Sequence, residues 1–234
     1  MTDETSGQFV QVRQRQGGKI FLKPKKPVSL VMLSCGVDSL YVLVKLLTET
    51  DDHVLVHHVH IINNENRHEI EATRTRQIVD WCQKQYRSFR YSESTINHTG
   101  FKGFGYDMMS VAFEAGMVCK SFYMTNNYPV SKLLTGWCTE EAPDPGRYKH
   151  VQAVTAANCY PYEPPKYFFF DRVTKMEEAR YLLPELVEMT WTCRRPVVEG
   201  DSYTECGKCP SCEVMGPVRA EQKHFLRTDL RESL

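Results

Sequence analysis

The sequence predicts an α/β protein with a doubly wound, mostly parallel sheet. Short apolar runs rich in strand-forming residues alternate with segments whose apolar residues recur at helical spacing. The connections between these segments are short, and the first apolar run stops at a turn of small residues. Repeated strand–helix units of this kind are typical of a parallel sheet covered on both faces by helices. In such folds the ligand site lies at the carboxyl ends of the strands.

The first strand–helix unit begins with the apolar run at residues 28–33. We expect this run to be a buried parallel strand, because it is continuous and not alternating. A tight turn at residues 34–39 follows it. Behind the turn, Leu40, Leu43 and Leu47 repeat at helical spacing and predict a helix.

The alternation of strands and helices continues to about residue 158. A second apolar run at 54–62 precedes the segment 67–83, in which Ile70, Ile78 and Trp81 form a helical face. The later elements are expected as a short strand near 88–91, a helix within 106–122, a strand at 132–136 and a helix around 151–158. The ends of these strands then bring Ser34, Asn63 and Gly136 to one edge of the sheet.

The two ends of the chain differ from this core in their pattern of polar and apolar residues. Residues 1–17 are polar and carry no apolar period, so we expect a flexible N-terminal arm that ends at Gly17-Gly18. Residues 18–170 form the predicted nucleotide-binding core. Residues 171–234 are expected to be a helical region packed on the core as one domain. The segment Thr174-Lys175-Met176-Glu177 has the form of a capping box and predicts the start of the first helix in this region.

The bulk composition narrows the classes of function. The 234 residues include 29 Lys plus Arg and 29 Asp plus Glu, so no net charge favours nucleic acid or an anionic membrane. We therefore expect no direct nucleic-acid partner and no membrane association. No apolar run approaches a membrane span, and the first residues do not resemble a secretory signal, which predicts a cytoplasmic protein. In a reducing compartment, nine cysteines indicate free thiols or metal ligands.

The turn at residues 34–39 is the first candidate site. Amide groups at a turn that leads into a helix point outward together, and the helix dipole adds partial positive charge there. Gly36 permits a close approach of the backbone, and the hydroxyls of Ser34 and Ser39 add donors. The alternative is that Asp38 or Ser39 only caps the helix. The candidate phosphate-binding residues are Ser34, Cys35, Gly36, Val37, Asp38 and Ser39.

Four cysteines near the C-terminus form a second candidate site. Cys193, Cys206, Cys209 and Cys212 follow the pattern C-x12-C-x2-C-x2-C. Two overlapping C-x2-C steps turn three thiolates around one ion, and the loop back to the first cysteine supplies the fourth ligand. Four thiolates without histidine favour a structural Zn²⁺. An iron–sulfur cluster or a pair of disulfides are the alternatives.

Together these motifs resemble the 7-cyano-7-deazaguanine synthase (QueC) family of PP-loop ATP pyrophosphatases. The turn is similar to the S-G-G-x-D-S signature, with Cys35 in place of the first glycine. The likeness runs from about residue 30 to residue 215. Further similar segments are Asn66-Arg67-His68 with Glu71, Leu134-Thr135-Gly136-Trp137-Cys138 with Glu141, Thr174-Lys175-Met176-Glu177 and Thr190-Trp191-Thr192-Cys193.

The resemblance implies an activity and a set of site residues. Such enzymes use ATP with Mg²⁺ to activate 7-carboxy-7-deazaguanine, convert it with ammonia to the amide, and dehydrate the amide to the nitrile. Ser34, Asp38 and Ser39 would be catalytic, and the loop 34–39 together with Gly136 would hold ATP. Arg67 and His68 would orient the nucleotide or substrate, or else form an ordinary solvated helix start. The expected substrate-binding residues are Glu140, Glu141, Asp144 and Arg147. Relatives commonly pair, so a homodimer is also expected.

Departures from the family pattern keep other functions open. Cys35 carries a Cβ where the family has glycine, and the substrate segment is here rewritten as Ala142-Pro143-Asp144-Pro145-Gly146-Arg147. These changes suggest a divergent, phage-encoded or defence-related member. One alternative is changed chemistry on a 7-deazaguanine used in DNA modification, such as loss of the carboxylate, and another is a nucleotide-binding module without turnover. A tRNA thiolation enzyme is disfavoured by the neutral charge.

A group of histidines on the second predicted strand is a weaker candidate. His53, His57, His58 and His60 lie within a few residues of one another and suggest a second metal site. Successive side chains of a strand point to opposite faces, so the four cannot all meet on one side. We therefore favour a structural role for them.

Overall fold

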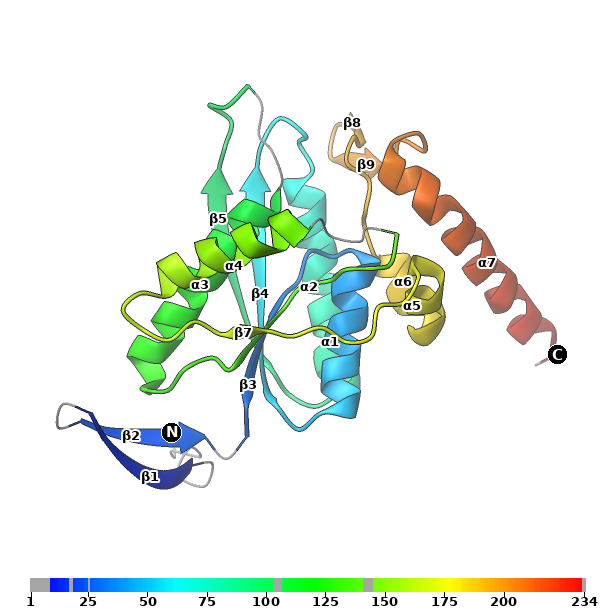
Figure 1. Cartoon of the computed structure of the whole chain (residues 1–234). Coiled ribbons are helices and arrows are strands. Elements are labelled where there is room, and N and C mark those ends of the chain that lie inside the picture. Colours follow the sequence, from blue (N-terminus) through cyan, green and yellow to red (C-terminus); the bar gives the residue numbers. More distant parts are fainter. Residues whose placement is uncertain (1–8, 17–18, 25, 103–106, 141–144, 233–234) are drawn as a thin grey trace.

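The computed structural model describes residues 9–16, 19–24, 26–102, 107–140 and 145–232. Its centre is a parallel five-stranded sheet with the order β5-β4-β3-β6-β7. The strands are β3 (Val28–Met32), β4 (His53–Ile62), β5 (Arg90–Asn97), β6 (Lys132–Leu134) and β7 (Lys166–Tyr167). The α/β fold with a parallel sheet that the sequence predicts is confirmed (Figure 1).

The strand order places a switch point between β3 and β6. From β3 the chain adds β4 and then β5 on one side, and it returns to add β6 and β7 on the other side. The connections that leave the carboxyl ends of β3 and β6 therefore diverge to opposite faces of the sheet. The crevice outside the strands at such a point is where open α/β sheets bind ligands. The loop 34–39 follows β3, and Gly136 follows β6.

Helices cover both faces of the sheet. Alternate residues of β3 therefore point into two different cores. Val31 packs in a core with α1 (Val37–Glu49) and α2 (His68–Gln85). Leu30 and Met32 pack in a second core with α3 (Asp107–Asn126). Helix α4 (Pro145–Cys159) lies against α3 on that same side (Figure 1). All residues of β3 are buried because helices cover the strand on both faces, and this explains why its sequence is a continuous apolar run.

The C-terminal region packs on the α1 side of the core. It contains α5 (Lys175–Tyr181), α6 (Pro184–Met189), the hairpin β8 (Val197–Glu199) and β9 (Ser202–Thr204), and α7 (Pro210–Glu232). The predicted capping box is present, because the Thr174 hydroxyl accepts from the Glu177 amide and the Glu177 carboxylate accepts from the Thr174 amide. Leu186, Trp191 and Met215 of this region share the core of α1. Cys82, Cys119 and Cys159 are buried, as expected for small apolar side chains.

Three elements differ from the expected boundaries. The predicted N-terminal arm includes β1 (Phe9–Gln16), which pairs with β2 (Lys19–Pro24) as an antiparallel hairpin. Gly17-Gly18 between the two strands is a hairpin signal that a search for apolar periodicity overlooks. Strand β5 extends to Asn97, well past the apolar residues, because it is a half-exposed edge strand. Helix α4 begins at Pro145, since proline is well suited to a first helical position.

Candidate functional site

The loop 34–39 leads into the first turn of α1 at the switch point. Helix α1 begins at Val37, and its N-cap residue Gly36 provides no side-chain hydrogen bond to the first turn. The first amide groups of a helix have no partner within the helix. Ser34, just before this turn, is exposed at the end of the sheet. The loop therefore offers a set of backbone donors beside the positive end of the α1 dipole.

Ser34 and Ser39 close the loop on itself. The Ser39 hydroxyl oxygen lies 3.1 Å from the Ser34 amide nitrogen, from which it accepts, and 3.2 Å from the Ser34 hydroxyl oxygen. It also donates to the Gly36 carbonyl oxygen at 3.2 Å. Ser39 is buried, whereas Ser34 is exposed. Of the two predicted hydroxyl donors, only that of Ser34 faces outward, and Ser39 supports the shape of the loop.

Gly136 brings the end of β6 against the start of α1. A Cβ atom at this position would lie 2.3 Å from the Ser39 amide nitrogen and 2.4 Å from the Asp38 carbonyl carbon. Real Cβ atoms do not approach backbone atoms so closely, so no other residue fits without moving the loop. Gly136, which the sequence predicts as a nucleotide-binding residue, is thus next to the loop and fixes its position by close packing.

Cys35 adopts a backbone conformation that favours glycine, and its side chain points away from the outer surface of the loop. Its φ angle is 55°, in the left-handed region. The thiol is fully buried and donates to the Trp191 carbonyl oxygen at 3.4 Å. The Trp191 amide donates in turn to the Cys35 carbonyl oxygen at 3.0 Å. Burial, with the nearby Glu71 carboxylate, raises the pKa of the Cys35 thiol well above its usual value, so the thiol is neutral.

Asp38 is held by a lysine from the C-terminal region. The Lys175 ammonium nitrogen lies 3.0 Å from one Asp38 carboxylate oxygen, and the lysine side chain is buried. The Lys175 amide donates to the Glu140 carboxylate at 3.1 Å, so Glu140 stabilises the start of α5. These contacts join three segments of the chain, the start of α1, the loop after β6 and α5.

Arg67 is fully engaged by carboxylates. Its guanidinium group donates to Glu65, Glu71 and Asp107, which surround it at the end of the sheet. The three negative charges raise its pKa against the opposing effect of burial. Arg194 pairs with Asp107 at 2.9 Å and with Glu65 at 3.2 Å, extending the network. The predicted role of Arg67 in orienting a nucleotide would therefore require it to leave these partners.

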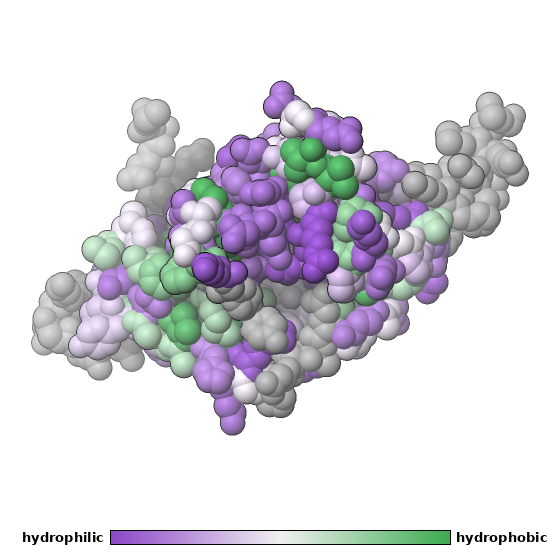
Figure 2. Space-filling view, turned by 90° about the horizontal axis from the view of Figure 1, so that it is seen from above, coloured by the Kyte–Doolittle hydropathy of each residue, from purple (hydrophilic) through white to green (hydrophobic). Residues whose placement is uncertain are grey.

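A cavity opens beside Ser34, between the ends of β3 and β4 and helix α3. Its polar lining includes Ser34, His57, His58, Arg67 and Asp107, and its apolar lining includes Leu33, Val59, Ile61 and Val111. The surface seen from this end of the sheet is mostly hydrophilic (Figure 2). Apolar walls with a few polar groups are typical of small-molecule sites.

The histidines of β4 have separate structural partners. The His57 ring nitrogens lie 2.8 and 2.9 Å from the hydroxyls of Ser92 and Ser94, and His60 contacts Glu93 at 2.7 Å. The Nδ1 atom of His58 lies 2.8 Å from the Leu33 carbonyl oxygen and must carry the proton, because a carbonyl only accepts. Burial lowers the pKa of both His57 and His58 to about 4, so both are neutral.

This tautomer leaves one buried histidine atom without a hydrogen-bond donor among the described residues. With its proton on Nδ1, His58 presents Nε2 as an acceptor, and that atom is buried without a hydrogen-bond partner in the described part of the chain. The four histidines do not form a metal-binding group together. Among residues 26–102, 107–140 and 145–222, the His, Cys, Asp and Glu side chains form one such group, which is made of cysteines.

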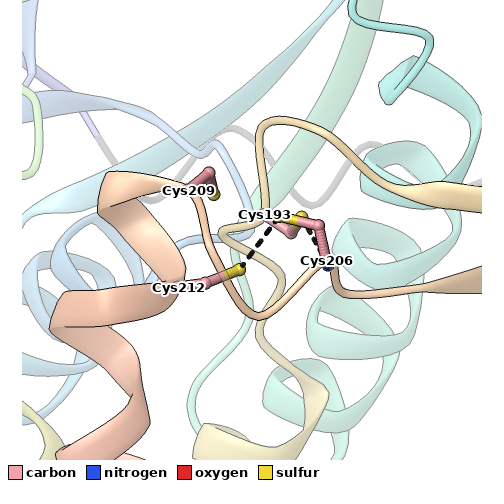
Figure 3. Close-up of side chains that lie close together, drawn as sticks. All are labelled: Cys193, Cys206, Cys209 and Cys212. Carbon is pink, nitrogen blue, oxygen red and sulfur yellow. Dashed lines mark hydrogen bonds between the residues drawn. The ribbon is translucent and has the colours of Figure 1, made fainter.

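The four predicted cysteines lie together at the start of α7 and in the segments before it (Figure 3). The sulfur atoms of Cys193, Cys206, Cys209 and Cys212 all lie within 4.8 Å of one another. Zn–S bonds of about 2.3 Å in a tetrahedron place sulfur atoms about 3.8 Å apart. The sulfurs of Cys206 and Cys212 are 3.9 Å apart. The group can hold a metal ion with little rearrangement.

Backbone contacts support the cysteine group. The Cys206 amide donates to the Cys193 sulfur at 3.2 Å, which stabilises negative charge on that sulfur. Gly207, between the first two closely spaced cysteines, has a φ angle of 67° and permits the tight turn there. Cys193 and Cys209 are almost fully buried. Four thiol groups at these positions could fill a tetrahedral shell around one metal ion.

One short segment connects the two candidate sites. Trp191 binds the backbone of Cys35, and Cys193 follows two residues later in the cysteine group. The Trp191 indole donates to the Cys193 carbonyl oxygen at 3.1 Å, and Trp191 is almost fully buried. In the sequence, these residues can be recognised only as part of the segment Thr190-Trp191-Thr192-Cys193. Their long-range contact had no signal in the sequence.

The four predicted substrate-binding residues are not seen together in the structure. Glu141 and Asp144 lie outside the described residues. Arg147 lies on α4, and Glu140 is engaged with α5. His68 is the first residue of α2, and its Nδ1 atom is buried without a hydrogen-bond partner in the described part of the chain. The site residues that the sequence alone does not reveal are Lys175, Trp191, Asp107 and His58, which lines the cavity.

None of the helices in the described part of the chain has both the length and the apolar character that a membrane crossing needs. No protein-family model matches this sequence, and no curated protein matches it either.

Proposed function

We propose that the protein binds ATP at the loop 34–39 and uses it to activate a 7-deazaguanine carboxylate, as a divergent member of the PP-loop type. The observation that carries the proposal is the uncapped start of α1 at the switch point of the sheet. Phosphate groups favour such a position, because backbone donors and the helix dipole act together there. Gly136 and Ser39 hold the loop in shape from two sides.

The cavity beside Ser34 would receive a planar heterocycle. His58 lines this cavity, and its buried Nε2 atom would accept a hydrogen bond from a ring N–H or an amino group of a purine-like base. Apolar walls at Val59, Ile61 and Val111 would pack on the faces of the ring. The cavity thus supports a ligand that carries both a base and a charged group near the loop.

The proposed reaction proceeds in two activations. The substrate carboxylate attacks the α-phosphorus of ATP and pyrophosphate leaves, and ammonia then displaces AMP to give the amide. In the second activation the amide oxygen attacks the α-phosphorus of another ATP and pyrophosphate leaves, and loss of AMP and of the two amide protons gives the nitrile. The protein would contribute positioning and charge stabilisation, since neither step needs a protein nucleophile. This agrees with the neutral, buried thiol of Cys35.

The cysteine group would bind Zn²⁺ and brace the loop. Four thiolates favour Zn²⁺ and leave no open position for water, so the ion would contribute to folding. Through Cys193 and Trp191 the ion would fix the backbone of Cys35. Magnesium would accompany the bound ATP.

The direct test is a reaction with a defined substrate. Purified protein is mixed with ATP, Mg²⁺, ammonium and 7-carboxy-7-deazaguanine, and the products are identified by mass spectrometry together with released AMP. We expect the amide or the nitrile and matching AMP. A Ser34→Ala variant should lose activity, whereas Ser121→Ala, at an exposed position on α3, should keep it. Wild-type protein that binds the base but forms neither product would refute the proposal.

A nucleotide-binding module without turnover is the second candidate. Two observations favour it. Lys175 forms an ion pair with Asp38, and three carboxylates form ion pairs with Arg67. Fewer charged groups are therefore available to stabilise a transition state. This candidate predicts ATP binding without AMP release under any substrate condition. Calorimetry with ATP and a non-hydrolysable analogue, run beside the product assay, separates the two functions.

A further inference from the structure

Glu178 is a buried carboxyl group that the proposed reaction does not use. It lies on α5, one turn after the cap residue Thr174, and its side chain is 1% exposed. Helix α5 packs against α1, and Glu178 lies close to the Asp38 side chain at the start of α1. A glutamate is seldom buried to this degree without a compensating partner.

The two carboxyl groups share an unusual pattern of hydrogen bonds. One Asp38 oxygen, Oδ2, accepts from Lys175, whereas Oδ1 is buried without a donor. On Glu178, Oε2 is likewise buried without a donor. Two ionised carboxylates can only accept, so neither oxygen could satisfy the other. One shared proton converts this pair of unsatisfied acceptors into a donor and an acceptor.

Charge balance favours the same conclusion. If both acids were ionised, Asp38, Glu178 and Lys175 would leave one uncompensated negative charge in a buried position, with Glu140 adding a further one nearby. With one proton on the pair, Asp38 and Lys175 balance each other. Burial and the adjacent Asp38 carboxylate raise the pKa of Glu178 to about 10, against the opposing effect of Lys175.

We propose that Glu178 is protonated at neutral pH and donates its hydrogen to Asp38, and that it is a positioning residue for the phosphate loop. The shared proton fixes the Asp38 side chain through the oxygen that Lys175 does not contact. It also keeps a second negative charge away from the start of α1, where it would repel a bound phosphate. The role in phosphate binding rests on the proposed function, whereas the protonation state does not.

Variants at Glu178 separate a neutral donor from a charged group. Glu178→Gln keeps the size and supplies an amide donor, so ATP affinity should stay within about twofold of wild type. Glu178→Leu keeps the apolar volume but leaves the Asp38 oxygen unsatisfied, and affinity should fall by about tenfold or more. The matched control is Glu185→Gln at an exposed position on α6, which should change nothing.

The deciding experiment combines infrared spectroscopy with calorimetry on the full chain. At neutral pH, the wild-type spectrum without nucleotide should contain a protonated-carboxyl C=O band that disappears in Glu178→Gln and persists in Glu185→Gln. Absence of that band in the wild type, or its persistence in Glu178→Gln, would overturn the proposal. So would a Glu178→Gln protein that fails to fold or binds ATP as weakly as Glu178→Leu. If wild-type protein shows the band but binds no ATP, the proposed function fails and the shared proton stands.

Discussion

The loop 34–39 and the cysteine group are encoded by the sequence in different ways. The cysteine group is built from four side chains, three of them within seven consecutive residues, and its chemistry follows from residue type and spacing. The loop depends instead on backbone conformation and on neighbours distant in sequence, such as Gly136 and Trp191. Side-chain chemistry at a fixed spacing can therefore be recognised in a sequence, whereas a backbone site requires the structure that surrounds it.

Removing a cysteine ligand should have the largest effect in the molecule. Cys209→Ser should abolish binding of one metal ion, because the remaining thiolates cannot close a tetrahedron, and the C-terminal region should lose its fold. Structural zinc ions contribute on the order of 10 kcal/mol in small domains. Metal analysis and thermal unfolding measure both effects.

The matched control for that experiment is Cys82→Ala, a buried cysteine outside the group. It should keep the full metal content and lose stability only through a small cavity. A Cys209→Ser protein with unchanged metal content and unfolding temperature would contradict the assignment of the group.

A methyl group at Gly136 should weaken ATP binding by the loop 34–39 without changing metal binding by the cysteine group. Gly136→Ala forces the new Cβ against the backbone of Asp38 and Ser39, and overpacking of this kind costs about 3 kcal/mol. ATP affinity should fall at least tenfold while the metal content is unchanged. Gly216→Ala, where a Cβ meets nothing within 4 Å, is the control and should bind normally. Normal ATP binding by Gly136→Ala would show that the loop is not the site.

The cavity histidine should make stability depend on pH. Burial lowers the pKa of His58 in the folded protein to about 4, whereas an unfolded histidine titrates near 6.5. A depressed pKa contributes stability that is present above about pH 6.5 and is lost as the pH falls toward 4. Between pH 7 and pH 5 this amounts to about 2 kcal/mol.

Urea unfolding at the two pH values measures the effect. His58→Gln should lose about 2 kcal/mol less stability than wild type between pH 7 and pH 5. His150→Gln, at an exposed position on α4, should behave like wild type. Identical pH dependence in His58→Gln and wild type would mean that this histidine is not held neutral by the fold.

Changes at Cys35 should have the smallest effect. Cys35→Ala and Cys35→Gly both remove the thiol contact with Trp191, but only glycine relieves the left-handed backbone. The glycine variant should therefore be more stable than the alanine variant by about 1 kcal/mol. Chemical denaturation measures the difference. A more stable alanine variant would contradict the positive φ angle at this position.

The strand–helix alternation could be predicted because hydrophobic periodicity is a local property. Residues 28–33 and the helix behind them were recognised from their own side chains. Strand β5 was recognised only in part, since a half-exposed edge strand carries polar residues along most of its length. The hairpin of β1 and β2 was missed because pairing, and not an apolar period, defines it.

The candidate site could be predicted only as isolated residues. The Lys175–Asp38 contact joins residues 137 positions apart, and the Cys35–Trp191 contact joins residues 156 apart. No local pattern encodes such pairs, because they depend on how α5 and the segment before Cys193 pack on α1. The same limit applies to Arg67, whose partner Asp107 lies 40 residues away on α3.

The most direct test of the account is to observe the loop amides while ATP is added. In ¹⁵N-labelled protein with its metal bound, the backbone amide resonances of Gly36, Val37 and Asp38 should shift on titration with Mg²⁺ and ATP, because the phosphates would accept hydrogen bonds there. Amides of the cysteine group should move little. Loop resonances that stay in place at saturating ATP would contradict the central claim.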